Sequence, residues 1–150
     1  MTRLRPNISF ITLGVTDLDR SRAFYADMGL EEHSSSSSKV AFFDMSGQIL
    51  ALFPREALAK DARVDPGASK GLTVTLSQNV KEREDIDRIL NRALEAGGRI
   101  LVEPSSPPWG GVRGYFADPD GTPWEIAWNP RTMIDSEGRV HLGESTHGSE

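Results

Sequence analysis

The sequence contains no cysteine among its 150 residues. Disulfide bonds, zinc–thiolate centres and thiol nucleophiles are therefore excluded as the basis of its structure or chemistry. A chain without cysteine fits a reducing compartment, so we expect a cytoplasmic protein. No apolar run approaches the roughly 20 residues that a membrane-spanning helix needs. The charged opening segment, residues 1–7, is followed by no signal-peptide core, so we expect no association with a membrane.

Histidine and clustered positive charge are also scarce. The formal net charge is -5, and the 17 Lys and Arg residues are scattered along the chain. A nucleic-acid partner is therefore not expected, because such proteins gather their basic residues into a patch. The three histidines, His33, His141 and His147, lie beside a serine run or near the end of the sequence. Catalysis by a Ser-His-Asp arrangement would lack a histidine base in the body of the chain.

The first half of the sequence predicts a strand, a helix and further strands. Residues 8–15 are apolar on both faces of a period-two pattern, as in a strand buried on both sides. Asp17 and Asp19 can cap a helix that extends to about Met28, and Gly29 suits its end. A short strand is expected to begin at residue 30, and two more at 40–44 and 49–53. The five serines at 34–38 predict a solvated loop or hairpin tip.

The second half restarts the same order of elements. Leu72, Val74 and Leu76 alternate with hydroxyl residues, which predicts a strand with one apolar and one polar face. The expected elements that follow are a helix (about 82–94, stopped by glycines at 97–98), a strand (99–103) and two further strands (112–117 and 123–128). Asp118-Pro119-Asp120-Gly121 is a tight-turn sequence between the last two.

A duplicated supersecondary unit explains this repetition. One β-α-β-β-β unit alone has open edges and a one-sided core, so two units are expected to pack together. We therefore predict an α+β fold in which two β-α-β-β-β repeats form a curved, mostly antiparallel sheet with helices outside and a cupped cavity inside. The predicted organisation is a single domain over 1–130, with repeat one at about 7–54, a connector at 55–69 and repeat two at about 70–130, followed by a partly disordered tail at 131–150.

Two motifs resemble those of a known family. Residues 13–25 (LGVTDLDRSRAFY) resemble the strand-to-helix opening of the vicinal oxygen chelate superfamily of glyoxalases, bleomycin-resistance proteins and extradiol dioxygenases. Residues 109–125 (WGGVRGYFADPDGTPWE) are similar to the closing hairpin of its glyoxalase-like subgroup. The resemblance covers about residues 6–130. It implies a homodimer, which also suits a curved sheet with open edges.

The resemblance implies metal chemistry, yet this sequence does not supply the metal ligands. In the family a divalent ion acts as a Lewis acid, held by His, Gln or Glu from the first and last strands of each repeat. The corresponding positions here are Phe10, the apolar run 49–53, the neutral hydroxyls of Thr73, Thr75 and Ser77, and Glu125. Hydroxyls are weak ligands, so only Glu125 matches. We expect no cofactor, with a divalent metal as the alternative.

The candidate site is therefore a ligand cavity around Glu125, which could act as catalytic base or as charged anchor. The predicted ligand-binding residues are Phe10, Thr73, Thr75, Trp109, Arg113, Tyr115 and Glu125. Several of them also have an ordinary structural explanation. Glu125 could pair with Arg113 or face water, the threonines could line a solvated face, and the aromatic rings could simply fill a core.

Three functions remain open from the sequence. The leading hypothesis is a glyoxalase/bleomycin-resistance-like protein that binds a small organic molecule in its sheet cavity without a bound metal. The alternative is a metal-dependent glyoxalase-like lyase, isomerase or dioxygenase in which Glu125 is a ligand or the general base. The third is a structural dimer with no ligand. Metal content separates the second hypothesis from the first, and a filled cavity would indicate the third.

Overall fold

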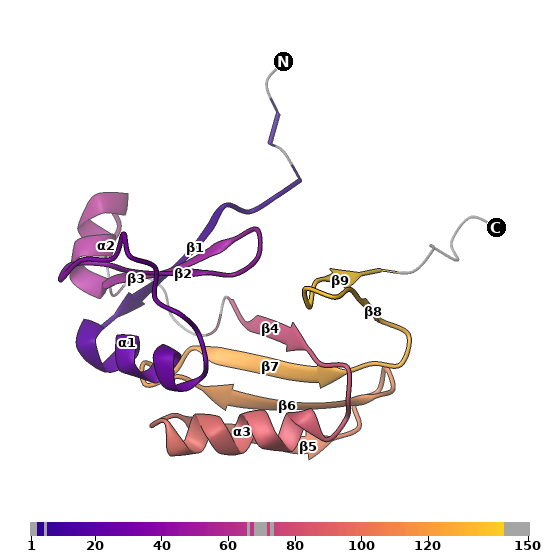
Figure 1. The fold of residues 1–150 in the computed structure, drawn as a ribbon. Coiled ribbons are helices and arrows are strands. Elements are labelled where there is room, and N and C mark those ends of the chain that lie inside the picture. Colours follow the sequence, from indigo (N-terminus) through magenta and orange to yellow (C-terminus); the bar gives the residue numbers. More distant parts are fainter. Residues whose placement is uncertain (1–2, 5, 66, 68–71, 73, 143–150) are drawn as a thin grey trace. The chain divides into compact units, whose positions relative to one another are not determined.

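The computed structural model describes residues 3–4, 6–65, 67, 72 and 74–142 (Figure 1). The chain divides into two compact units, Met1–Gly71 and Leu72–Glu150, and each is described by itself. Each unit contains one of the two predicted repeats, and the mixed α+β class is confirmed. The single domain over 1–130 stays a prediction, and residues 143–150 of the tail predicted to be partly disordered lie outside the described residues.

The first unit is a three-stranded sheet with two helices. Its elements are β1 (Phe10–Val15), α1 (Leu18–Asp27), β2 (Ala41–Asp44), β3 (Ile49–Pro54) and α2 (Arg55–Ala62). The strand order is β1-β3-β2, in which β1 runs parallel and β2 antiparallel to β3. Helix α1 begins where the side chain of Asp17 accepts a hydrogen bond from the backbone N–H of Arg20, as the sequence predicted.

The short strand expected at residue 30 is reduced to one isolated bridge between Glu32 and Phe43. The serine run that follows gives the physical reason. The hydroxyl of Ser36 accepts the backbone N–H of Phe42 at 2.9 Å, and the hydroxyl of Ser37 accepts that of Lys39 at 3.1 Å. These side-chain bonds occupy backbone donors that a longer ladder would need.

One face of the first sheet carries the core of its unit. Alternate residues of the strands, together with residues of α1, are almost fully buried: Val15, Ala41, Phe43, Leu50, Leu52, Phe24 and Tyr25. The ring of Tyr25 packs on that of Phe43, with centroids 6.2 Å apart. The strand residues of opposite parity include Phe10, Thr12 and Asp44, which are exposed. The sheet therefore has one covered face and one face with exposed side chains.

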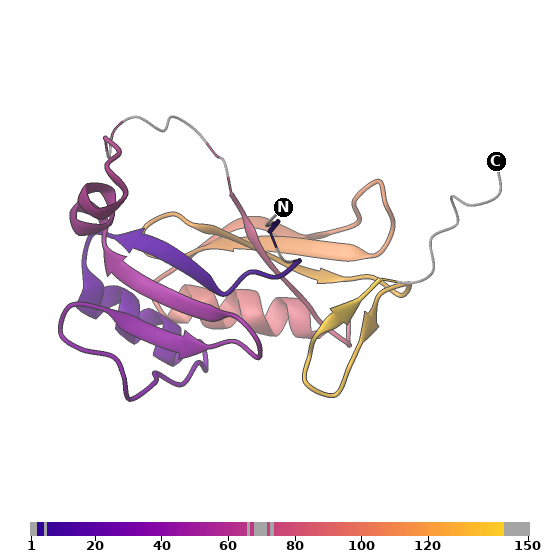
Figure 2. The ribbon, with the colours of Figure 1, turned by 90° about the horizontal axis from the view of Figure 1, so that it is seen from above.

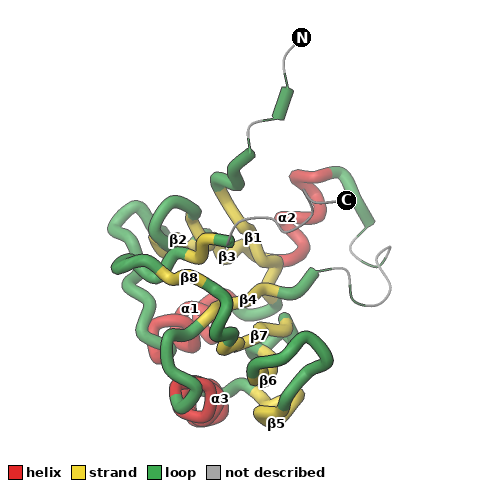
Figure 3. The backbone as a smooth tube through the Cα atoms, turned by 90° about the vertical axis from the view of Figure 1, so that its right-hand side faces the viewer, coloured by secondary structure: helices red, strands yellow, loops and turns green. Residues whose placement is uncertain are grey.

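The second unit repeats this plan with a four-stranded main sheet and adds a small two-stranded sheet. Its elements are β4 (Leu76–Asn79), α3 (Asp85–Glu95), β5 (Arg99–Ser105), β6 (Val112–Ala117), β7 (Pro123–Trp128), β8 (Met133–Ile134) and β9 (Val140–His141). The order of the main sheet is β4-β7-β6-β5, and Figure 3 shows the strands in that order with α3 beside them. In each unit the first and last strands of the repeat are parallel neighbours, β1 with β3 and β4 with β7.

The strand predicted from Leu72 begins only at Leu76. Its parallel register starts where Leu76 lies opposite Trp124, at the second residue of β7. In this register Thr75 would lie opposite Pro123, the first residue of β7, and earlier residues would have to pair with the turn that precedes β7. That turn is closed on itself, because Asp118 N–H donates to Thr122 O at 3.0 Å and Gly121 N–H to Asp118 O at 2.9 Å. Leu72 and Val74 are consequently exposed rather than paired in the sheet.

Helix α3 covers one face of the second sheet through Ile86, Leu90 and Ala93, all buried. A close approach is possible because β6 carries Gly114 at the contact. A Cβ atom added there would lie 2.7 Å from Leu90 Cδ1 and 3.0 Å from Val102 O. Phe116 and Trp124 stack beside this contact, with ring centroids 6.0 Å apart. The opposite face of the sheet is not covered by α3, and it carries the candidate site.

Part of the predicted tail forms a small hairpin. Met133 lies opposite His141, and Ile134 opposite Val140, with a turn at 135–138 between the strands (Figure 2). None of the described helices is long and apolar enough to cross a membrane.

Candidate functional site

The candidate site lies in the second unit, where polar side chains from neighbouring strands occupy opposed positions. Glu125 of β7 lies opposite Ser77 of β4 on one side and Tyr115 of β6 on the other. Residues directly opposite each other in a sheet point to the same face. The register therefore brings two hydroxyl groups to the carboxylate of Glu125.

Both carboxylate oxygens of Glu125 accept a hydrogen bond from these hydroxyls. Ser77 Oγ donates to Oε1 at 3.3 Å, and the Tyr115 hydroxyl donates to Oε2 at 3.1 Å. Tyr115 and Glu125 are half-buried, and Ser77 is exposed. A carboxylate has about four lone-pair sites, so each oxygen keeps room for one donor from a ligand. The two hydroxyls thus fix the direction of the carboxylate without exhausting its capacity.

The neighbouring charges act on Tyr115. Burial raises the pKa of its hydroxyl above the usual value, and the charge of Glu125 and the hydrogen bond to it raise the pKa further. The positive charge of Arg113 acts in the opposite direction and is the smallest of these causes. Tyr115 is consequently a protonated hydrogen-bond donor at neutral pH, and its role toward Glu125 is that of a fixed donor.

Arg113 completes this row of side chains on β6. Its Nη1 donates to the hydroxyl of Ser105, on the paired strand β5, at 2.6 Å. Among the described residues Glu125 forms no ion pair with Arg113, so the simple pairing considered from the sequence is not the arrangement found. The face therefore presents a carboxylate, a phenol and a guanidinium in sequence across β7 and β6.

The structure thus brings together three of the residues predicted from the sequence: Arg113, Tyr115 and Glu125. Thr75 is exposed and precedes β4, and Thr73 lies outside the described residues. Trp109 lies in the loop before β6, is 43% exposed, and packs its ring against Gly111. Phe10 belongs to the first unit, where it is 53% exposed and contacts Phe42 edge-on at 6.2 Å.

Other residues of potential function were missed. Ser105 was not singled out, although its register with Arg113 follows from two antiparallel strands. In the first unit, a pocket of about 170 Å³ is lined by Phe10, His33, Ser35, Phe42, Asp44 and Ile49. The strand alternation could have placed Phe10 and Asp44 on one face. No local signal could have predicted His33 there, because its position depends on how the serine run folds back.

The donor set around Glu125 does not fit a divalent ion. Its two neighbours are neutral hydroxyls, which bind such ions weakly without stronger ligands beside them. Among the described residues no group of three or more His, Cys, Asp or Glu side chains is placed to hold a metal. Glu125 is thus a single carboxylate beside two hydroxyl groups, and it can accept further hydrogen bonds.

The arrangement of the repeats agrees with the comparisons with known proteins. The family model of the glyoxalase/bleomycin resistance protein/dioxygenase superfamily matches residues 7–126. The chain belongs to this superfamily. No curated protein matches the sequence. The matched span includes both repeats and ends just after Glu125, so the candidate site lies within the part of the chain that defines the superfamily.

Solved structures of this superfamily are similar to the chain over most of its length. A glyoxalase-related enzyme from Fulvimarina pelagi is 34% identical, with a TM-score of 0.86, over 93% of this chain and 100% of that one. A glyoxalase/bleomycin resistance protein/dioxygenase from Nocardioides is 28% identical, with a TM-score of 0.69, over 95% and 93% of the two chains. A lactoylglutathione lyase from Agrobacterium tumefaciens, 23% identical with a TM-score of 0.64 over 84% and 96%, shares the fold.

Proposed function

We propose that this superfamily member binds a small organic molecule without a resident metal ion, and that Glu125 anchors the ligand. The observation that carries the proposal is the fixed carboxylate, held by the hydroxyls of Ser77 and Tyr115 on a sheet face that α3 leaves uncovered. A single oriented carboxylate suits a ligand with an N–H, an O–H or a positive charge. Tyr115 and Arg113 add a donor and a cation beside it, which supports a ligand with more than one polar group.

The first test is the metal content of the purified protein. We expect less than one equivalent of any divalent ion per chain and no ion-specific rise in melting temperature, because Glu125 lacks strong ligands as neighbours. One tightly held ion per chain would contradict a metal-independent function.

The second test is a thermal-shift screen of small organic molecules, followed by titration of each hit against variants. Glu125→Gln is expected to fold normally and to weaken a hit by about tenfold or more, because a charge-assisted hydrogen bond becomes a neutral one. Glu103→Gln is the matched control, since Glu103 is an exposed carboxylate on β5 of the same unit. Hits that bind both variants as tightly as the natural chain would remove Glu125 as the anchor.

An enzymatic function is the second candidate. The similarity to a glyoxalase-related enzyme at 34% identity favours it. Glu125 would then be the general base or the one family ligand position that this chain retains. A metal-dependent lyase, isomerase or dioxygenase would need further ligands besides the hydroxyls described around Glu125. Metal binding and turnover that appear when divalent ions are added would support this candidate over the first.

A homodimer in the cytoplasm is part of the same proposal. The two sheets end in edge strands, β1 and β2 in the first unit and β4 and β5 in the second, and open edges favour a partner. Sedimentation of the purified chain tests the dimer directly, and a monomer at micromolar concentration would contradict it.

A further inference from the structure

The β8–β9 hairpin is an addition to the main sheet of the second unit. It follows residue 126, where the match to the superfamily ends. Within the described part of the chain, its two strands pair only with each other. A two-stranded hairpin alone is marginally stable in water, and independent stability takes at least three strands with an apolar face. The hairpin therefore needs support beyond its own ladder.

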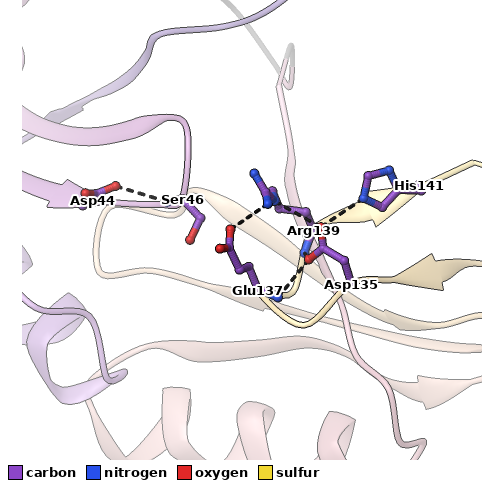
Figure 4. A network of polar contacts seen from close by, with 6 residues as sticks. All are labelled: Asp44, Ser46, Asp135, Glu137, Arg139 and His141. Atoms are coloured by element: carbon purple, nitrogen blue, oxygen red, sulfur yellow. Dashed lines mark hydrogen bonds and ion pairs between the residues drawn. The ribbon is translucent and has the colours of Figure 1, made fainter.

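One face of the hairpin is polar, and its side chains bind one another. The register places His141 on the same face as Asp135 and Arg139. The carboxylate of Asp135 binds His141 Nε2 at 3.0 Å and Arg139 Nε at 3.1 Å (Figure 4). Arg139 Nη2 also binds the carboxylate of Glu137 at 2.7 Å. The polar groups of this face are thus bound within the hairpin and require no external partner.

The other face of the hairpin is apolar and exposed. Ile134 and Val140 are directly opposed, and Leu142 follows Val140 by two residues, so the three side chains share this face. Val140 is 42% exposed and Leu142 is 89% exposed. The residues that come next in the sequence, 143–150 (GESTHGSE), contain no large apolar side chain. They offer nothing apolar to cover this face.

The backbone of β9 is positioned to accept another strand. The N–H of Asp135 donates to the carbonyl of Arg139 at 2.9 Å, which makes these residues a hydrogen-bonded pair. Bonded and non-bonded pairs alternate along an antiparallel ladder, so the N–H and C=O groups of Val140 and Leu142 point away from β8. On the outer edge of the β8 side, the N–H of Thr132 already donates within its own turn. The edge available for pairing is therefore that of β9.

This edge is complementary to itself. A two-fold axis at His141 places Val140 of one copy opposite Leu142 of the partner subunit, and Leu142 opposite Val140 of the partner subunit. Both pairs use backbone groups that point outward, so both are hydrogen-bonded pairs. Both are also apolar pairs, and such cross-strand pairs stabilise a sheet. The charged turn around Glu137 lies away from the axis, so the symmetry does not bring like charges of the two turns together.

We propose that β9 pairs with β9 of a second copy of this chain about a two-fold axis at His141. The two hairpins then form one four-stranded sheet with a continuous apolar stripe of Ile134, Val140 and Leu142. This contact rests on the homodimer of the proposed function and adds to it a defined surface and register. It gives the hairpin the additional strands that its stability requires, and it closes an open edge.

The test is sedimentation equilibrium of the full chain and of charge variants. Val140→Glu and Leu142→Lys should each weaken the dimer by about tenfold or more, because each charge faces an apolar partner at two equivalent positions. The double variant places Glu opposite Lys in both pairs and should regain most of the lost affinity. Met133→Lys is the matched control, since Met133 is 62% exposed on the opposite face of the same hairpin. It should leave the dimer unchanged.

Amide hydrogen exchange locates the contact independently. The amides of Val140 and Leu142 should exchange more slowly in the dimer than in the dilute monomer, whereas the His141 amide, which points toward β8, should change little. A dimer that Leu142→Lys does not weaken, or a double variant as weak as the single ones, would overturn the β9 contact and leave the proposed homodimer standing. A monomer at all concentrations would contradict both, and ligand binding at Glu125 would still be measured by its own variants.

Discussion

The hydroxyl of Tyr115 donates to Glu125 Oε2 at 3.1 Å from the directly opposed position of the neighbouring strand. The pair couples the two strands that form the centre of the second sheet. The charge of Glu125 is also one cause of the raised pKa of the Tyr115 hydroxyl. The titration of Tyr115 therefore reports on the charge of Glu125.

Glu125→Gln is expected to lower the pKa of Tyr115 toward its ordinary value. Burial, the largest cause of the raised pKa, persists in the variant, but the negative charge of Glu125 is lost. The measurement is an ultraviolet titration of phenolate absorbance, in which Tyr115→Phe identifies the signal because the chain has 2 tyrosines. An unchanged Tyr115 pKa would contradict the described contact.

The same shift predicts how stability depends on alkaline pH. The folded-state pKa of Tyr115 is raised above the ordinary value of about 10. Its contribution to stability is therefore complete below that value and is lost as the pH rises through the folded-state pKa. Glu125→Gln should reduce this alkaline loss, whereas Glu103→Gln should not alter it. Melting temperatures measured across the alkaline range provide the check.

Gly111→Ala should destabilise the second unit far more than Gly110→Ala. Both glycines have positive φ, +72° and +91°, so both variants incur backbone strain. A Cβ atom at residue 111 would also lie 2.3 Å from Trp128 O and 2.8 Å from Trp109 Cζ3. At residue 110 the nearest atom would be Arg131 Nη2 at 3.8 Å. We expect a loss of roughly 1–2 kcal/mol for Gly110→Ala and at least about 3 kcal/mol for Gly111→Ala. Urea unfolding measures both, and equal losses would contradict the contact with Trp128.

Much of the fold was predictable because both repeats carry strong local signals. Asp17 at the start of α1 and the Asp118–Gly121 turn before β7 behave as their chemistry predicts. The start of β4 was not predictable from alternation, because Leu72 and Val74 fit a strand pattern. Whether they pair depends on the register with β7, and β7 begins only at Pro123. The start of β4 is therefore set by a partner strand that lies far from it in the sequence.

Glu125 and Tyr115 of the candidate site were predictable from the sequence, whereas the place of His33 in the first-unit pocket was not. Glu125 and Tyr115 could be found because strand parity and the family motif place both on one face of a hairpin. His33 could not be placed, since its position depends on hydrogen bonds between the serine run and Phe42. Side-chain contacts within an irregular segment have no periodicity that a sequence pattern could reveal.

Arg22→Ala should increase the mobility of residues 33–40, which include His33 and Ser35 of the first-unit pocket. The Arg22 side chain, 22% exposed, pairs through Nε with Glu32 at 2.9 Å and donates through Nη2 to Val40 O at 3.1 Å. Loss of this ion pair and of this charge-assisted hydrogen bond is expected to cost about 1–3 kcal/mol. Amide hydrogen exchange should accelerate at residues 33–40 and stay unchanged in the second unit. Arg20→Ala, on the same helix, is the control, because the exposed Arg20 contacts Thr16 of its own turn. Equal acceleration in both variants would contradict a specific stabilising role for the Arg22 contacts.

Asp135 should make the β8–β9 hairpin sensitive to acid. Its carboxylate binds His141 Nε2 at 3.0 Å and the backbone N–H groups of Arg139 and Glu137, each at 2.9 Å (Figure 4). The hydrogen bond with His141, first among these causes, holds the Asp135 pKa far below its usual range. A lowered folded-state pKa stabilises the hairpin above the ordinary value of about 4, and the benefit is lost as the pH falls below it.

Amide exchange at Glu137 and Arg139 should therefore rise relative to intrinsic rates between neutral pH and pH about 3. Asp135→Asn keeps an acceptor for the turn and should remove this pH dependence, whereas Glu137→Gln should retain it. A hairpin equally protected at both pH values in the natural chain would show that the carboxylate is not what holds it.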